Sequence, residues 1–276
     1  MASTYSTDPK TALKELFGAS KYVIGMVHLL PLPGSPKWAG AMATVLARAV
    51  SDARALEAGG ADGLMVENLG DVPFCKSHVE PHTIAAMTLA VRAVRETVTI
   101  PVGVNVLRND CKSAIAIASV TDCQFVRVNV HTGAMVTDQG IVEGDAYETM
   151  RYRKELGADV KVFADVLVKH ATPLTCQSLK QVARDTAYRG LADAVVVTGS
   201  ETGLAADRDD VVGATEAVPD VPVLVGSGVD EDNVARLLAV ADGAIVGSSL
   251  KKGASTANAI DRVRVERLMA AVGTLR

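Results

Sequence analysis

Short apolar segments rich in β-branched residues alternate along the chain with longer segments in which apolar residues recur at helical spacing. This alternation is typical of a parallel sheet whose strands are joined by crossover helices. We identify eight strand segments, at residues 22–28, 63–68, 102–107, 125–130, 160–168, 194–198, 221–226 and 244–246. Amphipathic segments between and after them include residues 44–58, 83–97, 145–156, 178–189, 231–240 and 257–271.

The number and spacing of these segments predict a closed barrel. Strand starts recur about every 32 residues, and eight such units match the usual size of a (β/α)8 TIM barrel. We therefore expect a single barrel domain over residues 1–276. A doubly wound open sheet is the alternative, but that fold usually has fewer strands. Before the first strand, Asp8, Pro9 and Gly18 stand where an N-cap, a first helical residue and a C-terminal glycine belong, which predicts a short helix covering the barrel floor.

Two connections, residues 28–43 and 131–144, are longer than most βα loops. Each follows a predicted strand, so in a barrel each lies over the face that carries active sites. Prolines stiffen the first connection. Gly133, Gly140 and Gly144 should let the second connection hinge and exclude water from the site.

Composition narrows the classes of partner. Of the 276 residues, 49% are apolar and 22% are charged, and the net charge of −4 lacks the basic excess of a nucleic-acid-binding protein. No apolar run approaches the roughly 18 residues that span a bilayer, and residues 1–21 lack a signal-peptide core, so we expect a cytoplasmic protein. The four cysteines have neither zinc-site nor disulfide-framework spacing.

Polar residues stand at the ends of nearly all predicted strands, where barrel enzymes carry their active sites. Period-two alternation places Glu67 on the same side as Met65, and Asp165 on the same side as Phe163, and this side faces the barrel interior. Buried polar groups are costly unless they bind a ligand or one another. The candidate catalytic residues at these ends are Asp165, Glu67, Lys169, His28, Asn105 and Asn129.

The two carboxylates admit three interpretations. In the one we favour, Asp165 and Glu67 act as acid and base while Asn105 and Asn129 orient substrate hydroxyls. In the second, the same two carboxylates hold Mg²⁺ or Mn²⁺, although their spacing matches no dedicated metal motif. In the third, Glu67, Asp165 and Arg127 form a buried ion network that fixes the register of the barrel.

The remaining strand-end residues carry weaker signals. His28 suits packing or hydrogen bonding better than catalysis, and His131 and His170 compete with it for a catalytic role. Lys169 is the only strand-end lysine, and the strand at residues 194–198 lacks the lysine of a Schiff-base aldolase. The sequence lacks a nucleophile elbow, a Walker loop and a dinucleotide-binding glycine motif, so a serine nucleophile, nucleotide hydrolysis and nicotinamide redox have no support. No cofactor is required, and Mg²⁺ or Mn²⁺ stays the one alternative.

A better-defined pair of motifs lies near the C-terminus. Gly226, Ser227 and Gly228 follow one predicted strand, and Gly247 and Ser248 end an Asp-Gly-x-Ile-Val-Gly-Ser sequence at the next. Glycines there let backbone N–H groups approach a ligand closely, and a helix N-terminus after the last strand attracts anions. In TIM barrels these positions form the usual phosphate site. We predict phosphate binding, with tight turns that hold no ligand as the alternative.

Five segments together resemble the BtpA/SgcQ family: GMVHLLPLPGSP at 25–36, VENLGDVPF at 66–74, GVNVLRND at 103–110, RVNV at 127–130 and DVLVKH at 165–170. The likeness continues through both glycine motifs to about residue 269. It implies a barrel similar to the ribulose-phosphate-binding group, with site residues at Glu67, Asn105, Asn129, Asp165 and Lys169. One branch of the family is named for photosystem I biogenesis and another is labelled phosphoribosyltransferase-like, so the resemblance implies a fold more than a reaction.

Two classes of function follow. We expect an enzyme that acts on a sugar phosphate or a nucleoside-derived sugar phosphate by isomerisation, epimerisation, aldol-type cleavage or glycosyl transfer. A noncatalytic assembly factor of the photosystem I biogenesis type is the alternative, but a scaffold has no need for desolvated carboxylates around an empty mouth. The expected partner is a small phosphorylated substrate, not nucleic acid or a membrane. The sequence is also compatible with a homo-oligomer.

Overall fold

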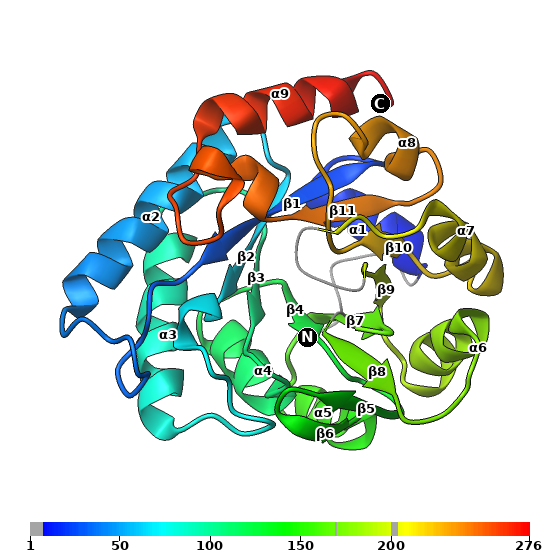
Figure 1. The fold of residues 1–276 in the computed structure, drawn as a ribbon, viewed down its shortest axis with the longest axis horizontal. Coiled ribbons are helices and arrows are strands. Elements are labelled where there is room, and N and C mark those ends of the chain that lie inside the picture. The colour runs from blue at the N-terminus through cyan, green and yellow to red at the C-terminus, as the bar shows by residue number, and fades with distance from the viewer. Residues whose placement is uncertain (1–7, 169, 200–203) are drawn as a thin grey trace.

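The computed structural model describes residues 8–168, 170–199 and 204–276. Within these ranges, eight parallel strands close a barrel in the order β1-β11-β10-β9-β7-β4-β3-β2 (Figure 1). The strands are β1 (Tyr22–His28), β2 (Gly63–Glu67), β3 (Val102–Asn105), β4 (Phe125–Val128), β7 (Lys161–Val166), β9 (Ala194–Val197), β10 (Val223–Val225) and β11 (Gly243–Val246). Each predicted strand segment overlaps one barrel strand. The predicted TIM barrel is confirmed.

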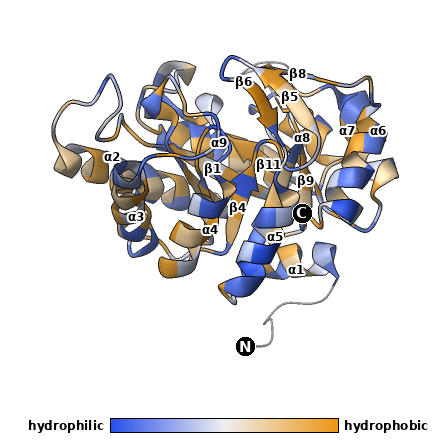
Figure 2. Cartoon of the chain, turned by 90° about the horizontal axis from the view of Figure 1, so that it is seen from below, coloured by the Kyte–Doolittle hydropathy of each residue, from blue (hydrophilic) through white to orange (hydrophobic). Residues whose placement is uncertain are grey.

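Helices surround the barrel and cover its outer face (Figure 1). They are α2 (Met42–Ala58), α3 (Pro81–Arg95), α4 (Cys111–Val120), α5 (Ala146–Glu155), α6 (Leu179–Arg184), α7 (Arg208–Ala217), α8 (Val234–Leu238) and α9 (Arg262–Gly273), with short helices η1 (Leu69–Asp71), η2 (Asp185–Arg189), η3 (Ser248–Leu250) and η4 (Lys252–Ala254). Figure 2 shows apolar strands inside a more polar shell, most clearly at α5, whose outer face is hydrophilic.

Large side chains fill the barrel interior. They come from every second position along each strand, because successive side chains of a strand point to opposite sides. The rings of Phe125 and Phe163 stack with their centroids 4.9 Å apart, and Met65 is fully buried in the same cluster. Gly103, which pairs in register with Phe125, leaves the space that this ring needs, because an added Cβ would lie 2.1 Å from it. The predicted inward side of these strands is confirmed.

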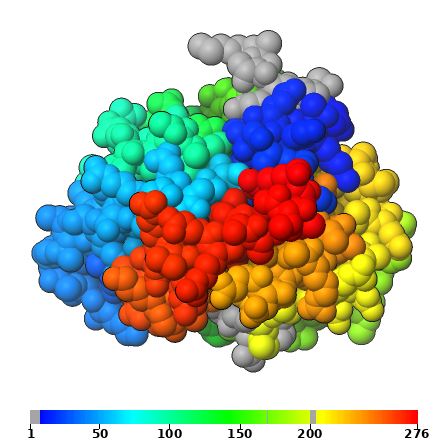
Figure 3. Space-filling model, turned by 90° about the horizontal axis from the view of Figure 1, so that it is seen from above, coloured from blue at the N-terminus to red at the C-terminus, as the bar shows by residue number. Residues whose placement is uncertain are grey.

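Helix α1 (Pro9–Phe17) closes the amino end of the barrel, as the sequence predicts. Asp8 caps it by accepting a hydrogen bond from the Thr11 N–H at 2.9 Å, and Gly18 ends it with a φ of 67°. The Phe17 ring lies 5.5 Å from that of Phe125, so α1 seals the aromatic core from below. Figure 3 shows the C-terminal residues beside this N-terminal segment, where the Arg276 guanidinium donates to the carbonyl of the residue before β1.

The connection at residues 131–144 is an ordered hairpin, so the expectation of a glycine-hinged loop is wrong. Strands β5 (Ala134–Thr137) and β6 (Gly140–Glu143) pair antiparallel, and β8 (Ala171–Pro173) adds to β5. The backbone ladder and the burial of Met135 and Val142 fix the segment. The turn of the hairpin carries Asp138, which lines the cavity described next.

Candidate active site

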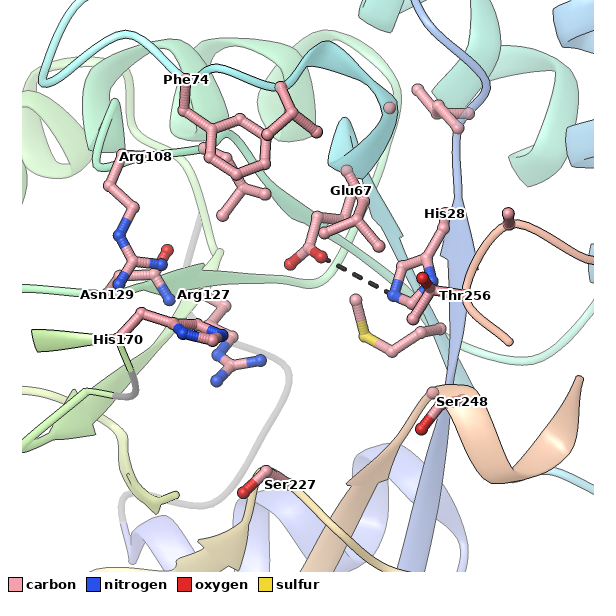
Figure 4. A pocket seen from close by; sticks show the side chains of 18 of the residues that line it. His28, Glu67, Phe74, Arg108, Arg127, Asn129, His170, Ser227, Ser248 and Thr256 are labelled. Carbon is pink, nitrogen blue, oxygen red and sulfur yellow. Dashed lines mark ion pairs between the residues drawn. The ribbon is translucent and has the colours of Figure 1, made fainter. Parts of the chain in front are cut away.

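A cavity of about 930 Å³ lies at the carboxyl ends of the barrel strands (Figure 4). This is the face on which barrel enzymes carry out their chemistry. Polar and glycine residues that line it are His28, Lys37, Glu67, Gly70, Arg108, Arg127, Asn129, Asp138, His170, Gly226, Ser227, Gly228, Gly247, Ser248 and Thr256. Three of the catalytic candidates predicted from the sequence line this cavity: His28 on β1, Glu67 on β2 and Asn129 after β4.

Glu67 and His28 form a pair in the wall of this cavity. They end β2 and β1 and are register partners, so the parallel pairing brings their side chains to the same level. The His28 Nε2 atom lies 3.7 Å from the Glu67 Oε1 atom, and 9% and 8% of the two side chains is exposed. A carboxylate and an imidazole with this little water around them are suited to passing a proton to and from a ligand.

Asp165 lies beneath the cavity floor, held by Arg127 and Asn129. The Arg127 Nε and Nη2 atoms donate to its two carboxylate oxygens at 2.8 and 3.0 Å, and the Asn129 amide donates at 2.9 Å. None of the Asp165 side chain is exposed. The expectation that Asp165 shares an open cavity with Glu67 is therefore wrong. Its inward direction is right, but the long Arg127 side chain and the Asn129 amide cover it.

The arginine of this network stays cationic. Burial by itself would lower the pKa of Arg127, but the charge and hydrogen bonds of Asp165, with the charge of Glu67, outweigh it and raise this pKa. Asn105 lies in the same covered layer and is fully buried, with its amide nitrogen 3.5 Å from the Asn129 side-chain oxygen. The expectation that Asn105 lines the cavity is also wrong, whereas Asn129 does line it.

The other candidates from the sequence, Lys169, His131 and His170, do not lie together. Lys169 lies outside the described residues. His131 is buried, its Nε2 atom lies 2.9 Å from the Gly190 carbonyl, and burial lowers its pKa, so it fastens β4 to the η2 region. His170 is exposed and lines the cavity.

The two glycine motifs both border the cavity, next to β10 and β11. Gly228 has a φ of +63°, and an added Cβ there would lie 2.1 Å from the Ala205 backbone nitrogen. An added Cβ at Gly247 would face His28 at 3.2 Å. After Gly247, the N–H of Leu250 is the first to bond within η3, so the N–H groups before it have no acceptor in that turn. The Ser227 hydroxyl instead braces its loop, accepting from the Gly199 N–H at 2.6 Å.

Sequence reasoning missed several residues of the cavity wall. Arg108 is 5% exposed and follows β3 by three residues, and Lys37, Phe74, Asp138 and Thr256 come from loops and lie well beyond the strand ends. Burial lowers the pKa of Arg108, opposed mainly by the charge of Asp165. A search confined to strand ends cannot find such residues.

The donor set does not fit the Mg²⁺ or Mn²⁺ considered from the sequence. Both oxygens of Asp165 already accept hydrogen bonds from Arg127 or Asn129, and the guanidinium occupies the position next to the carboxylate that a cation would need. In the part of the chain that the structure describes, no three His, Cys, Asp or Glu residues are grouped to hold a metal. We derive no chemistry through a metal.

The sequence model of the BtpA family matches residues 19–274. The chain belongs to the BtpA family. It is 49% identical to the photosystem I biogenesis protein BtpA of Synechocystis sp., over 94% of this chain and 91% of that protein. It is 34% identical to the sgc region protein SgcQ of Escherichia coli, over 96% and 98% of the two chains. The resemblance drawn from the sequence motifs is confirmed.

Comparison with solved structures supports the fold. N-(5'-phosphoribosyl)anthranilate isomerase from Pyrococcus furiosus superposes with a TM-score of 0.55 at 15% identity, covering 92% of this BtpA-family chain and 99% of that one. At this identity the likeness concerns the barrel and not the reaction. Among the helices that the structure describes, none has the length and apolarity needed to cross a membrane.

A buried charge network ties α2 to the loop that carries Thr256. The Lys251 Nζ atom lies 3.5 Å from the Asp52 carboxylate, with 0% and 1% of the two side chains exposed. Asp52 also accepts from the Arg48 Nε atom at 3.0 Å and from the Ile260 N–H at 2.9 Å. Asp52 thus fastens both ends of the segment that borders the cavity at Thr256.

We expect Lys251→Met to lower the free energy of unfolding near neutral pH by less than the roughly 3–5 kcal/mol that removing one partner of a buried ion pair usually costs, because Arg48 still neutralises Asp52. Burial lowers the pKa of Lys251 below its usual 10.5. Between the lowered pKa of Lys251 in the folded protein and its usual value, the unfolded chain binds more protons than the folded chain does. The free energy of unfolding of the parent therefore rises with pH in this range. The variant lacks this rise, so its deficit in stability relative to the parent grows with pH.

Urea denaturation at about pH 7 and pH 10 measures this difference. Lys252→Met, at the exposed neighbouring residue, corrects for the change in net charge. A gap between Lys251→Met and the parent that stays constant with pH would contradict the prediction.

Proposed function

We propose that this BtpA-family protein is an enzyme that acts on a phosphorylated sugar, by isomerisation, epimerisation, aldol-type cleavage or glycosyl transfer. One observation carries the proposal: the largely desolvated pair of Glu67 and His28 lines the same cavity as the two glycine loops after β10 and β11. A proton-transfer pair beside an anion-binding loop is the combination that chemistry on a sugar phosphate requires.

The phosphate is placed on the loops after β10 and β11. N–H groups at the start of η3 have no acceptor in their own turn, and Gly247 lets a ligand approach them because it carries no side chain. Arg127 lies next to these loops, with its Nη2 atom 3.3 Å from the position of an added Cβ at Gly226, and its guanidinium has further N–H groups besides those that bind Asp165. Fixed N–H groups and guanidinium groups are the donors that bind phosphate most strongly.

Glu67 takes or gives the proton, with His28 as its neighbour in the wall. Asn129 and Arg127 face the same cavity and donate to substrate oxygens. Asp165 is a positioning residue in this scheme, because it is covered and acts through Arg127 and Asn129. The strands hold these groups in place before a ligand arrives, which lowers the cost of orienting them.

The proposal is tested by incubating the protein with a panel of pentose and hexose phosphates and following their conversion by ³¹P NMR and mass spectrometry. Conversion of a panel member that needs the protein supports an enzyme. Binding of phosphorylated sugars with no conversion of any of them, at high protein concentration and over long incubation, contradicts it.

We expect Gly247→Ala to weaken binding of ribose 5-phosphate by about tenfold, because the new Cβ narrows the approach to the η3 N–H groups and pushes on His28, 3.2 Å away. Binding of ribose should change little. Ligand-observed NMR detects both. Gly228 is unsuitable for this test, since its positive φ and the Ala205 backbone make any side chain there a folding defect. An equal loss of affinity for ribose and for ribose 5-phosphate would contradict the phosphate site.

A noncatalytic role in assembly is the second candidate, and the observation that favours it is the 49% identity to a photosystem I biogenesis protein. Expression of this chain in Synechocystis lacking its own BtpA separates the candidates. If Glu67→Gln restores photosystem I as well as the parent chain does, the role in assembly does not depend on the chemistry of Glu67.

A further inference from the structure

The cavity has two chemically different ends. Ser227 and Ser248 mark the glycine loops at one end, and Phe74 lies at the other, with Glu67 and Arg127 between them (Figure 4). Phe74 belongs to the segment after β2, which also contributes Leu69 and Val72 to the lining. Glycine loops suit a phosphate, whereas this second end offers an aromatic ring and aliphatic side chains, with Arg108 beside them (Figure 4).

The apolar end is built in advance by buried polar side chains. The Asn68 side-chain oxygen accepts from the Leu107 N–H at 2.8 Å, and its amide donates to Asp71 at 3.1 Å. Asp71 in turn accepts from the Leu32 N–H at 2.8 Å. These bonds tie the segment carrying Phe74 to the loops after β1 and β3. The carbonyl of Cys75, next to Phe74, also accepts from the Arg108 N–H at 3.0 Å. The backbone on both sides of Phe74 is therefore held without a ligand, which lowers the cost of ordering the ring.

The size of the cavity lies near the upper end of the range for ligand pockets. Pockets for drug-sized ligands span about 300–1,000 Å³, and this cavity holds about 930 Å³. A pentose phosphate placed on the glycine loops and beside Glu67 leaves the Phe74 end unfilled. An apolar surface left in contact with water in an enclosed site favours a ligand that covers it.

We infer that the substrate is a pentose 5-phosphate that carries an aromatic ring at its anomeric carbon, as a nucleoside 5′-monophosphate does. The phosphate lies on the loops after β10 and β11, the sugar lies beside Glu67, and the ring lies against Phe74. This inference rests on the proposed function and names its substrate class. In such a molecule the phosphate and the ring stand at opposite ends of the sugar, as the two ends of the cavity do.

The test is isothermal titration calorimetry with adenosine 5′-monophosphate, uridine 5′-monophosphate, ribose 5-phosphate and adenosine. We expect at least one monophosphate to bind about tenfold more tightly than ribose 5-phosphate, because stacking of a base on an aromatic side chain contributes on this scale. Phe74→Ala should remove this difference and leave ribose 5-phosphate binding unchanged. Phe74→Leu should retain only part of it, since leucine is apolar but not planar.

Leu89→Ala is the matched control, because Leu89 is 57% exposed on the neighbouring helix α3. If ribose 5-phosphate binds but neither base adds affinity, the inference is overturned and the proposed function stands. If adenosine binds as tightly as its monophosphate, the phosphate site and the inference both fail. If no probe binds, the inference fails, and the panel of pentose and hexose phosphates decides the proposed function separately. Equal losses in Phe74→Ala and Leu89→Ala would also overturn the placement of the ring.

Discussion

We expect Glu67→Gln to lower turnover of the phosphorylated substrate by about 10²- to 10⁴-fold, the usual contribution of a general acid or base. Glutamine has nearly the same shape as glutamate and can still contact His28, but it cannot take up or release the proton. Glu67 is 6% exposed, so bulk water has little access to replace it. The fold should survive, because the substitution introduces no buried charge.

The measurement is kcat on a substrate that the phosphate panel yields, with circular dichroism to confirm the fold. Glu155→Gln, on the exposed end of α5, is the control for the same chemical change away from the cavity. Glu155→Gln should retain parental turnover. Turnover by Glu67→Gln within a few-fold of the parent would remove Glu67 from the proton-transfer role.

The second large effect concerns stability: Asp165→Asn should lower the free energy of unfolding by about 3–5 kcal/mol, the usual cost of breaking a buried ion pair. Three donors point at the Asp165 carboxylate, two from Arg127 and one from Asn129. Asparagine offers one acceptor oxygen, so in either orientation its NH₂ group faces a donor. The Arg127 side chain, which is 3% exposed, then carries a buried charge without its counterion.

Urea denaturation gives the change, and Glu216→Gln is the control. Glu216 pairs with Lys180 at 2.7 Å on the surface, so its loss should not measurably affect unfolding. A double variant, Arg127→Met with Asp165→Leu, should recover part of the stability because it removes both buried charges. An Asp165→Asn protein as stable as the parent but inactive would reinstate Asp165 as a direct participant in the chemistry.

The local pattern along the chain was enough to predict the barrel and the direction of its strand side chains. Segments of alternating type repeated at βαβ length have few arrangements that bury every apolar face. Alternation alone put Met65, Phe125 and Phe163 inside, and the structure has them in one cluster. The cap and terminal glycine of α1 are equally local signals, since they depend only on residues within a few positions.

The hairpin at residues 134–143 depended on a partner that no local pattern shows. Its third strand, β8, comes from beyond β7, about 30 residues further along the chain. Glycines at its turn are as typical of a mobile loop as of a tight hairpin. Only the pairing of β5 with β8 and the burial of Met135 distinguish the two.

The sequence by itself determined that Glu67, Asn105, Asn129 and Asp165 point into the barrel at its carboxyl end, because their side follows from period-two alternation. Only the tertiary structure decided which of them a ligand can reach. Their depth depends on the stagger between strands and on which neighbour is longer, and neither quantity is encoded in one strand. Arg127 and Asn129 reach over Asp165, whereas Glu67 lies beside His28 in the wall of the cavity. Phe74 and Arg108 reach the same cavity from loops whose paths depend on contacts between residues far apart in the sequence, such as the bond from the Arg108 N–H to the Cys75 carbonyl.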